Sequence, residues 1–420
     1  MRILVIGRGG REHAIVWALR RSDKAKRIFC APGNAGTAML AENVPIGEME
    51  FDRLVQFAQD HAVDLAVVGP DDPLAAGIVD AFEAARIPVY GPRRNAAEIE
   101  GSKIFMKNLL RKYNIPTARY ETFSDYETAL AYLRAQPAPI VIKADGLAAG
   151  KGVTVCFTRE EAERALRETM VDKAFGAAGD KVVIEEYLEG QEMSILSFVD
   201  GETVRPMPPA QDHKPAFDGD KGPNTGGMGT YSPLPHIPQS VVDEAVETIV
   251  KPAARALAAE GRPFRGVLFA GLMITKDGPR AIEFNARFGD PETQVVLPRL
   301  KTDLLDIFLA SLCGRLDEID IVWSDEAAVC VILASAGYPG AYAKGMPIEG
   351  LDEVPAGTLV FHAGTAERDG RIVTNGGRVL GVVGLGNGIA EARGRAYEAA
   401  DRIRFEGKHC RTDIAAKALR

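Results

Sequence analysis

The sequence predicts a multidomain α/β protein that begins with a parallel β-sheet, and three observations support this prediction. The chain has 420 residues, more than the roughly 100–200 that one domain usually holds. Over the first hundred residues, short apolar runs alternate with helical patterns, as in βαβ units. Turn-forming residues follow each apolar run. In an open parallel sheet, such loops gather beyond the carboxyl ends of the strands, where ligands bind.

The N-terminal domain is expected to span residues 1–100. Its predicted strands lie at residues 3–6, 27–30, 65–68 and 88–90, and its predicted helices at residues 11–21, 51–61 and 74–86. A second domain is expected at residues 101–325 and includes a small subdomain at about residues 118–190. A third, C-terminal domain of mixed α/β structure is expected at residues 326–420.

In the second and third domains, strands are predicted at residues 139–143, 153–157, 182–186, 266–275, 281–287, 329–334, 359–363 and 379–383, and helices at residues 103–113, 160–170, 241–260 and 390–403. A segment at residues 208–235 is rich in Pro, Gly, Asp and Asn. Loops longer than ~12–15 residues are usually either functional or disordered, so we do not expect this segment to be a passive connection.

Composition excludes several function classes. The net charge of −8 and the pI of about 5.5 argue against a general binder of nucleic acid or membrane surfaces. No stretch approaches the ~18–20 apolar residues of a membrane helix. The cysteines and histidines lack the spacing of a zinc site or a disulfide framework. We therefore expect a cytoplasmic protein without nucleic-acid or membrane partners. We also expect a monomer that acts on small molecules.

The opening Gly-Arg-Gly-Gly turn suggests a dinucleotide site, but two features disfavour one. That fingerprint needs a third glycine where this chain has Glu12, and an acidic residue at the end of the second strand. A glycine turn at the start of a helix still suits an anion, and Arg11 would add a charged hydrogen-bond donor. A tight turn without any ligand remains the alternative.

The segment VIKADGLAAGKGVTV, residues 141–155, has the glycines and lysines of a phosphate-binding loop. It does not match the Walker A motif, because Gly152 follows Lys151 and a strand resumes where a helix should begin. A glycine-rich loop between two antiparallel strands can fold over phosphates as a flap, with Lys143 as a nearby positive charge. The alternative is a hairpin without function.

The segment VVIEEYLEG ends a predicted strand with two adjacent carboxylates, Glu185 and Glu186. Strand alternation directs one of them inward and the other outward. The backbone of Tyr187 and Leu188 would then face an adenine edge, and Glu192 would reach a ribose hydroxyl. Paired acids at a strand end are also common on a solvated face.

The strand AIEFNAR places three polar side chains on one face. Glu283, Asn285 and Arg287 alternate with Ile282, Phe284 and Ala286, and neighbours on a face are ~6.5–7 Å apart. Carboxylate and amide oxygens suit Mg²⁺, and an arginine beside them would grip a phosphoryl oxygen. A structural Glu–Arg ion pair is the alternative.

The loop QDHKPAFDGDKGPNTGGMGTYSP is dense in polar residues, among them Asp212, His213 and Lys214. Such a loop is either a solvent-facing segment or a substrate-recognition surface. We expect His213 to be a hydrogen-bonding or surface residue, because it lacks partners for a metal site.

These motifs together resemble one enzyme family over essentially the whole chain. The matching segments, in order, are GRGGREHA, APGNAGT, GPDDPL, EGSK, IKADGLAAGKG, QDHK…GPNTGGMGTYSP, IEFNARFGDPETQ and HAGT…TNGGRVL. The chain resembles the glycinamide ribonucleotide synthetases (phosphoribosylamine–glycine ligases), ATP-grasp enzymes of purine biosynthesis. The resemblance implies an ATP-grasp core with a mobile lid at about residues 118–190. It also implies ligation of 5-phosphoribosylamine and glycine through a glycyl phosphate, with ATP as co-substrate and Mg²⁺ or Mn²⁺ as metal.

The resemblance also implies roles for individual residues. ATP contacts are implied for Lys103, Lys143, Gly146, Gly150, Lys151, Gly152, Glu185, Tyr187, Leu188 and Glu192. Metal ligands are implied at Glu283 and Asn285, and catalytic roles for Arg287 and Lys143. Substrate contacts are implied for Gly9, Gly10, Arg11, Asp212, Lys214, Asp290 and Glu292.

Three other functions are compatible with parts of the sequence. Another ATP-grasp carboxylate–amine ligase or carboxylase would share the ATP site but take a different acceptor. A regulatory protein would bind ATP without turning it over, although the Lys, Glu and Arg positions argue against this. An NAD-dependent oxidoreductase is the third, and it would have to bind nicotinamide.

Overall fold

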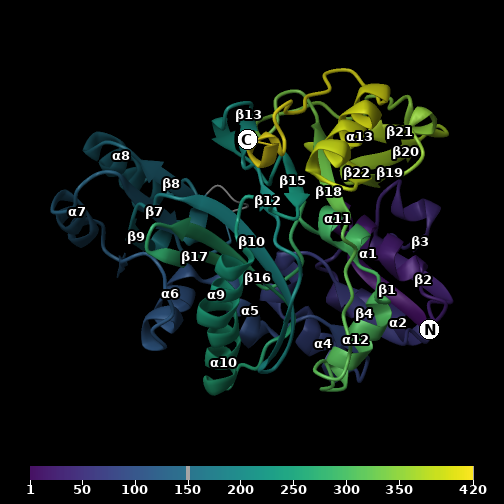
Figure 1. Cartoon of the computed structure of the whole chain (residues 1–420). Coiled ribbons are helices and arrows are strands. Elements are labelled where there is room, and N and C mark those ends of the chain that lie inside the picture. Colours follow the sequence, from purple (N-terminus) through teal and green to yellow (C-terminus); the bar gives the residue numbers. More distant parts are fainter. Residues whose placement is uncertain (148–151, 420) are drawn as a thin grey trace.

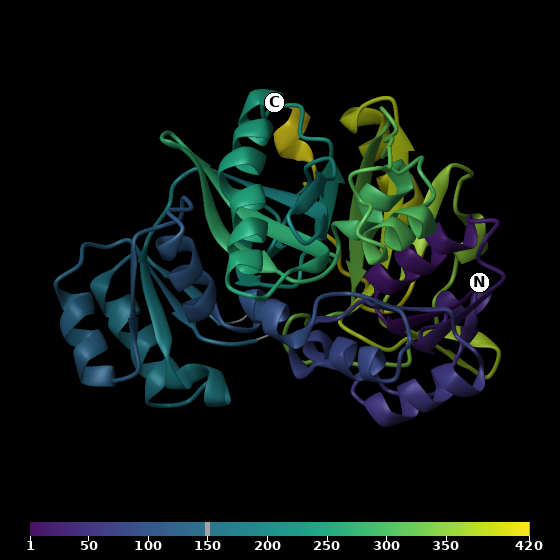
Figure 2. The same ribbon diagram turned by 90° about the horizontal axis from the view of Figure 1, so that it is seen from below.

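Four β-sheets of four or five strands organise the chain in the computed structural model, which describes residues 1–147 and 152–419 (Figure 1). The N-terminal sheet and the C-terminal unit lie on one side of the molecule, and a small lid projects from the other. Figure 2 shows the same separation from below.

The N-terminal sheet is parallel, as predicted, with strand order β3-β2-β1-β4-β5. Its strands are β1 (Arg2–Gly7), β2 (Arg27–Pro32), β3 (Glu42–Asn43), β4 (Leu65–Val68) and β5 (Val89–Tyr90), and its helices include α1 (Gly10–Arg20) and α2 (Phe51–Asp60). The predicted helix at residues 74–86 is instead two helices, α3 (Asp71–Ala76) and α4 (Ile78–Ala84). Gly77 separates them because its φ of 96° ends a right-handed helix.

The lid is an antiparallel sheet covered by two helices. Its strand order is β6-β9-β7-β8, with β6 (Tyr120–Phe123), β7 (Ile140–Ala144), β8 (Val153–Cys156), β9 (Val182–Glu186), α7 (Tyr126–Arg134) and α8 (Arg159–Met170). A capping box between Thr158 and Glu161 starts α8. Leu133, Ile142 and Leu166 belong to an apolar cluster confined to the lid, so the lid has a core of its own.

The central sheet is antiparallel, in the order β11-β10-β16-β17. It comprises β10 (Gln191–Asp200), β11 (Thr203–Pro206), β16 (Arg265–Thr275) and β17 (Gly278–Asn285). The helix predicted at residues 241–260 forms as α9 (Gln239–Ala245), a π-helical turn (Val246–Val250) and α10 (Lys251–Ala259).

One part of the predicted alternation in β17 is wrong. Glu283 pairs with Gly271 and Ala281 pairs with Leu272, so Ile282 is an extra residue in a bulge. As a result Ala281 is buried and Ile282 is only half-buried. After the bulge, the buried Phe284 and Ala286 alternate with the polar residues as predicted.

The fourth sheet joins the polar loop to the C-terminal unit. Its order is β12-β15-β18-β22-β19, with β12 (Gln211–Asp212), β15 (Gly229–Ser232), β18 (Ala327–Ala334), β19 (Thr358–His362) and β22 (Arg378–Gly386). Helix α13 (Ile389–Arg402) packs on β22 and β18. Residues 208–235 also form a hairpin of β13 (Pro215–Phe217) and β14 (Lys221–Asn224). The predicted loop is therefore a set of short strands.

The remaining elements connect these sheets. They are α5 (Arg94–Gly101), α6 (Lys103–Lys112), α11 (Thr293–Val296), α12 (Leu304–Leu312), β20 (Thr365–Arg368), β21 (Arg371–Thr374) and short 3₁₀ turns at Thr37–Met39, Gly176–Asp180, Leu297–Arg299, Leu351–Glu353 and Ala416–Leu419. Among the described residues, no helix is long and apolar enough to cross a membrane. The predicted α/β multidomain architecture with a parallel N-terminal sheet is confirmed.

Candidate active site

Glu185 lies between two buried lysines at the base of the lid. Lys107 Nζ on α6 is 2.6 Å from the Glu185 carboxylate, and Lys143 on β7 forms a second ion pair with it. All three side chains are buried. Burial lowers the pKa of Lys107 to about 8. Although burial favours the neutral acid, the two ammonium groups hold the pKa of Glu185 below its usual value.

Lys143 connects the lid to the central sheet. Its Nζ donates a hydrogen bond of 3.1 Å to the carbonyl of Ile282, the bulged residue of β17. The bulge therefore turns a backbone oxygen toward the lid lysine. The sequence predicted Lys143 as a phosphate contact, and this position places its ammonium beside the polar residues of β17.

Lys103, the first residue of α6, points to the start of the glycine-rich loop. Its Nζ donates to the carbonyl of Gly146 at 2.9 Å. Ser102 caps α6 and also donates to Asp145 at 3.1 Å, so the helix start is tied to the loop. Burial lowers the pKa of Lys103, while the charge of Glu283 opposes this shift.

The predicted flap is only partly described. Gly146 has a φ of 119°, which a residue with a side chain rarely adopts. Gly152 is buried, and its carbonyl accepts a hydrogen bond of 2.8 Å from the N–H of Ala144. Gly150 and Lys151 lie outside the described residues.

Tyr187 and Leu188 follow β9, where the adenine contact was predicted. Among the described residues, no backbone hydrogen bond of the loops involves either of them. The Tyr187 ring packs edge-on against Phe157, with ring centroids 5.8 Å apart. Glu186 faces outward and binds Arg119 at 2.7 Å, as the predicted alternation requires.

Glu283 faces three lysines. Lys214 Nζ lies 3.5 Å from Glu283 Oε1 and 3.5 Å from Glu192 Oε2. The charge of Lys214 lowers the pKa of Glu283 against the effect of burial, and Lys143 and Lys103 lower it further. Glu192 and Glu283 in turn raise the pKa of Lys214 well above its usual value. Both partners therefore stay charged at neutral pH.

Asn285 and Arg287 share a partner that the sequence did not single out. Glu100, at the end of α5, accepts from Asn285 Nδ2 at 3.0 Å and from the backbone N–H of Ala286 at 2.8 Å. Arg287 Nη2 is 2.9 Å from the same carboxylate and 3.9 Å from Asp71. Arg287 Nε is buried and has no hydrogen-bond partner among the described residues, so a donor remains for an anionic ligand.

The glycine turn at α1 is partly filled by Glu12. This carboxylate accepts from the N–H of Gly9 at 2.6 Å and from Arg11 Nε at 2.5 Å. A Cβ atom on Gly7 or Gly69 would lie 2.5 Å or 2.0 Å from the Glu12 side chain. Glu12 thus occupies the place where a dinucleotide-binding loop receives a pyrophosphate, and its negative charge would repel one.

Arg11 and Gly10 connect this turn to the segment after β17. Arg11 Nη1 donates to the carbonyl of Phe288 at 3.2 Å. Gly10 is in close contact with Gln294, since a Cβ at Gly10 would lie 2.6 Å from the amide nitrogen. A Cβ on Gly9 would be 3.2 Å from Asp290 Oδ2, so the turn borders the predicted substrate residues.

Two acids near Lys214 are held partly neutral. Burial and the charge of Asp212 raise the pKa of Glu292 to about 8. Burial also raises the pKa of Asp212 to about 6, against the opposing charge of Lys214. A carboxyl group with a pKa near neutrality can accept a proton from a reacting amine and release it again.

The C-terminal unit adds an arginine to the site. Arg378, the first residue of β22, donates through Nη1 to the carbonyls of Gly226 at 2.7 Å and Asp290 at 2.9 Å. Its Nη2 lies 3.4 Å from Asp290 Oδ1. Asp290 also accepts from Gln294 at 2.9 Å. Arg378 therefore links the loop after β17 to the Gly226 turn.

The donor set suits a magnesium ion with few protein ligands. Among the described residues, no three His, Cys, Asp or Glu side chains lie together so that they could hold a metal ion. Glu283 offers a carboxylate, and Asn285 offers its amide oxygen because Glu100 engages the amide nitrogen. Mg²⁺ commonly takes one or two protein oxygens and completes its shell with water and substrate phosphates.

The structure brings most of the predicted residues together through these contacts, and it adds four that sequence reasoning missed. The additions are Glu12, Glu100, Lys107 and Arg378. Glu100 lies in the EGSK segment and Arg378 in the TNGGRVL segment. Both segments were recognised as motifs of the family, but no function was predicted for these two residues. Lys107 gave none, because a lysine on a helix is ordinarily expected at the surface.

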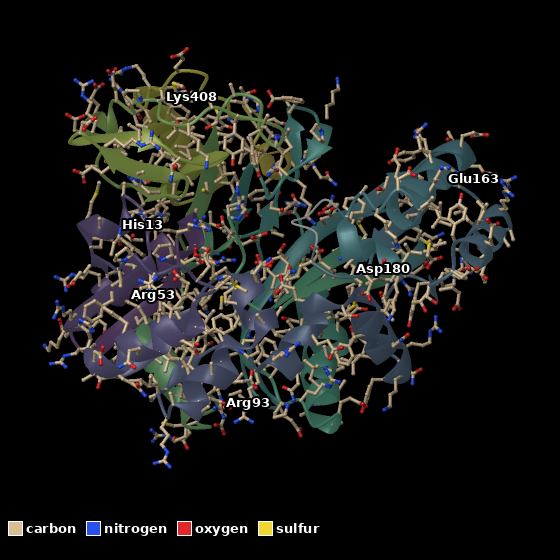
Figure 3. All side chains as sticks on the ribbon, turned by 180° about the vertical axis from the view of Figure 1, so that it is seen from behind. His13, Arg53, Arg93, Glu163, Asp180 and Lys408 are labelled. Carbon is tan, nitrogen blue, oxygen red and sulfur yellow. The ribbon has the colours of Figure 1, made fainter. Side chains whose placement is uncertain are left out.

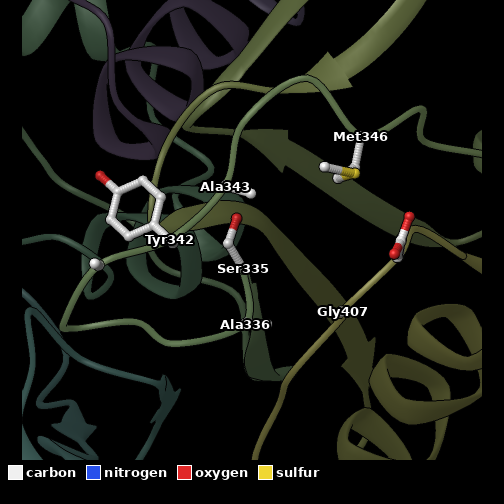
Figure 4. A pocket seen from close by; sticks show the side chains of 8 residues that line it. Ser335, Ala336, Tyr342, Ala343, Met346 and Gly407 are labelled. Atoms are coloured by element: carbon white, nitrogen blue, oxygen red, sulfur yellow. The ribbon is translucent and has the colours of Figure 1, made fainter.

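The cavity shown in Figure 4 lies apart from this cluster. It measures about 430 Å³ and is lined by residues of the C-terminal unit such as Ser335, Tyr342 and Met346. None of the predicted site residues lines it. Figure 3 shows the lid residues Glu163 and Asp180 on one side of the molecule and His13 of the N-terminal unit on the other.

Comparisons with known proteins agree with this arrangement. Three models of phosphoribosylglycinamide synthetase match the chain: the N domain over residues 1–100, the ATP-grasp (A) domain over residues 101–293 and the C domain over residues 328–417. The phosphoribosylamine–glycine ligase of Halalkalibacterium halodurans is 52% identical over 419 residues, covering 100% of this chain and 97% of that one. The ligase of the same name from Vibrio cholerae is 51% identical and covers 100% and 99%.

Solved structures show the same fold. The crystal structure of phosphoribosylamine–glycine ligase from Thermotoga maritima superimposes with a TM-score of 0.87 at 36% identity, covering 99% of this chain and all of that one. The biotin carboxylase domain of the Hydrogenobacter thermophilus 2-oxoglutarate carboxylase, solved with MgADP, gives a TM-score of 0.75 at 17% identity and covers 97% and 91%. This second likeness shows the fold alone.

Proposed function

The chain belongs to the phosphoribosylglycinamide synthetase family, and on that premise we propose how its residues perform the phosphoribosylamine–glycine ligase reaction. The enzyme joins 5-phosphoribosylamine to glycine in purine biosynthesis, and ATP becomes ADP and phosphate. The observation that carries this function is the identity of about half of all residues, over the whole length, with ligases of that name.

The first step transfers the γ-phosphoryl group of ATP to glycine. A carboxylate oxygen of glycine forms a bond to phosphorus while the bond to ADP breaks, which gives glycyl phosphate. Lys103 and Lys143 neutralise the phosphates, and Gly146 and Gly152 border them. Positioning and charge neutralisation are the main demands of phosphoryl transfer, so no nucleophilic Ser or Cys is required.

Adenine and ribose bind at the junction of the lid and the central sheet. The backbone groups of Tyr187 and Leu188, which make no loop hydrogen bond to the described residues, would bind the adenine edge, and Glu192 would reach the ribose. Glu185 contributes by fixing Lys143 rather than by contacting the base with its carboxylate, because both of its oxygens lie beside lysines.

Glu283 and Asn285 would hold the divalent metal. The bound ion would supply positive charge that polarises the phosphates. Glu100 orients the amide of Asn285, and it orients Arg287 at the same time. The Nε of Arg287, which has no hydrogen-bond partner among the described residues, would then donate to the acyl phosphate oxygens.

The second step forms the amide bond. The amine nitrogen attacks the glycyl carbonyl carbon, the bond to phosphate breaks, and the nitrogen loses one proton. We assign Glu292 as the acceptor of this proton, because it is buried beside the proposed substrate residues Asp212 and Lys214, and burial and the charge of Asp212 raise its pKa to about 8. Phosphoribosylamine and glycine are bound by Gly9, Gly10, Arg11, Asp212, Lys214, Asp290 and Glu292.

Several expectations from the sequence remain predictions. They are the choice between Mg²⁺ and Mn²⁺, the monomeric state, the cytoplasmic location and the domain limits at residues 1–100, 101–325 and 326–420. The glycyl phosphate route and the individual site assignments belong to the proposal as well.

Omission kinetics test the proposed function. Phosphate release is measured with ATP and Mg²⁺, with phosphoribosylamine generated in situ and glycine present, and each component is left out in turn. Release that needs both glycine and the amine supports the ligase reaction. Phosphate release that does not depend on glycine or on phosphoribosylamine would favour another ATP-grasp ligase with a different acceptor. In a separate binding test, an absence of nicotinamide binding would exclude the oxidoreductase.

A further inference from the structure

Lys214, one of the proposed substrate residues, precedes the β13–β14 hairpin, and the end of the chain holds this hairpin. Figure 1 shows the C terminus beside β13. We call residues 409–417 the C-terminal clasp. The clasp follows α13 and lies almost two hundred positions after the hairpin, so only the tertiary structure brings the two together.

Arg411 is the centre of the clasp and is almost completely buried, with 1% of its surface exposed. Its Nη1 donates to the carbonyl of Pro215, the residue next to Lys214, at 3.1 Å. Its Nη2 donates to Asp220 at 3.0 Å and to Asp413 at 2.8 Å. One guanidinium thus contacts both the first residue of β13 and the end of the turn that joins β13 to β14.

A second group of contacts reinforces the first. Asp413 accepts from the N–H of Gly219 at 2.9 Å, and Lys417 donates to Asp220 at 2.7 Å. His409 Nε2 lies 2.8 Å from the carbonyl of Ala216. The clasp therefore contacts the first strand of the hairpin and its turn.

The residue before Lys214 is also held by the clasp. His213 is buried, and its Nε2 accepts a hydrogen bond of 3.3 Å from the N–H of Ala415. Its Nδ1 must then carry the proton and donate to the carbonyl of Gly229, 3.2 Å away. Burial lowers the pKa of His213 to about 4, so the neutral ring that this pairing requires persists at physiological pH.

The backbone of Lys214 itself is fixed from the opposite side. Its carbonyl accepts from the N–H of Thr225 at 2.8 Å and from the Thr225 hydroxyl at 2.7 Å. Thr225 follows β14, so the position of this bond depends on the hairpin that the clasp holds. Beyond these anchors, the Lys214 ammonium extends to Glu283 and Glu192.

We propose that the C-terminal clasp sets the position of Lys214 in the active site, with Arg411 and Asp220 as positioning residues for the binding of glycine or phosphoribosylamine. This inference rests on the proposed function of Lys214. A lysine side chain has many rotamers, so its placement depends on a fixed backbone. A displacement of about 1 Å of a group that positions the substrate can lower the reaction rate by a large factor.

The test compares two Asp→Asn variants. Asp220 is exposed and has a φ of 56°, a conformation that Asn adopts readily, so Asp220→Asn removes the charge without straining the chain. Asp369→Asn is the matched control, because Asp369 is exposed, has a φ of 51° and lies in the turn of another hairpin of the C-terminal unit. Arg411→Gln is a second, stronger variant if its far-UV circular dichroism is native.

Three quantities are measured for each variant: the KM of each substrate, the melting temperature, and amide hydrogen exchange of a peptide covering residues 213–225. We expect Asp220→Asn to raise the KM of glycine or phosphoribosylamine about threefold to tenfold, with a nearly unchanged KM for ATP. Exchange within residues 213–225 should become faster. Asp369→Asn should behave like the wild type, and Arg411→Gln should exceed Asp220→Asn.

Two results would overturn the proposal. One is unchanged exchange at residues 213–225 in Asp220→Asn, which would mean that the clasp does not hold the hairpin. The other is faster exchange with all KM values equal to those of Asp369→Asn. Absence of ligase activity in the wild type would instead contradict the proposed function, and the exchange measurement would still decide whether the clasp holds the hairpin.

Discussion

Glu100 and Asn285 are 185 residues apart in the chain, yet the Asn285 amide donates to the Glu100 carboxylate at 3.0 Å. The same carboxylate binds the N–H of Ala286 and the guanidinium of Arg287. A single buried acid therefore orients the proposed amide ligand of the metal and the arginine that would face the acyl phosphate. Such supporting partners can matter nearly as much as the ligands.

Glu100→Gln should reduce catalysis without abolishing ATP binding. The neutral amide keeps the shape but lacks the charge that pairs with Arg287, so we expect kcat to fall about 10- to 100-fold. The KM for ATP should change much less. Glu98→Gln is the control, since Glu98 is on the same helix and pairs with Arg262 instead. Equal kcat values for both variants would contradict the role of Glu100.

Glu283→Gln and Asn285→Asp should each lower activity sharply. Removal of a preorganised charge-stabilising group typically costs ~2.7–4 kcal/mol, or about two to three decades in rate. Calorimetric titration of ATP with and without Mg²⁺ gives a second readout, and the magnesium-dependent part of the affinity should be lost in Glu283→Gln. Activity near that of the wild type in both variants would refute the metal assignment.

Glu185→Gln should destabilise the protein by removing the counter-charge of Lys107 and Lys143. Loss of one partner of a buried ion pair typically costs about 3–5 kcal/mol, because an uncompensated buried charge remains. Lys107→Met combined with Glu185→Gln should recover part of this loss, since one of the stranded charges is then absent. Urea denaturation measures all three proteins. A double variant that is less stable than Glu185→Gln would contradict this explanation.

The rate should depend on pH through Glu292. Because this acid must be ionised to accept a proton, kcat/KM should rise with pH up to about 8, the pKa that burial and Asp212 produce. Glu292→Gln should lose this rise and have a much lower kcat. Glu168→Gln, at an exposed position of α8, is the control. An identical pH profile in Glu292→Gln would rule out Glu292 as the acceptor.

The same shift predicts how stability varies with pH. The folded-state pKa of Glu292 lies above the ordinary value of 4.5, so between these two values the folded protein binds more protons than the unfolded chain. The contribution of this group to stability is therefore complete at pH values below about 4.5 and is lost as the pH rises toward about 8. Relative to the wild type, Glu292→Gln should become more stable as the pH increases across this range, and thermal unfolding at several pH values would show it.

Local patterns were enough to predict much of the fold and part of the site. Strands β4 and β9 were predicted with their observed limits. Short apolar runs that contain β-branched residues and are bounded by turns rarely form any structure other than a strand. Alternation also placed Glu283 and Asn285 on one face, since side chains in a strand repeat every two residues. The bulge at Ile282 was missed because it depends on pairing with β16, which the local sequence does not encode.

By itself, the sequence determined the α/β architecture with its parallel N-terminal sheet, the order of the motifs and the chemical types of the proposed site residues. Only the tertiary structure decided which of these residues meet. Glu100 and Lys107, on the consecutive helices α5 and α6, meet residues of β17 and β9, and Arg378 of β22 meets the loop after β17. The C-terminal clasp contacts the β13–β14 hairpin, which lies almost two hundred positions earlier in the chain. The physical reason is that backbone propensity and hydrophobic periodicity act over a few residues, whereas buried charges select partners by proximity in the folded chain, where an unpaired charge is costly.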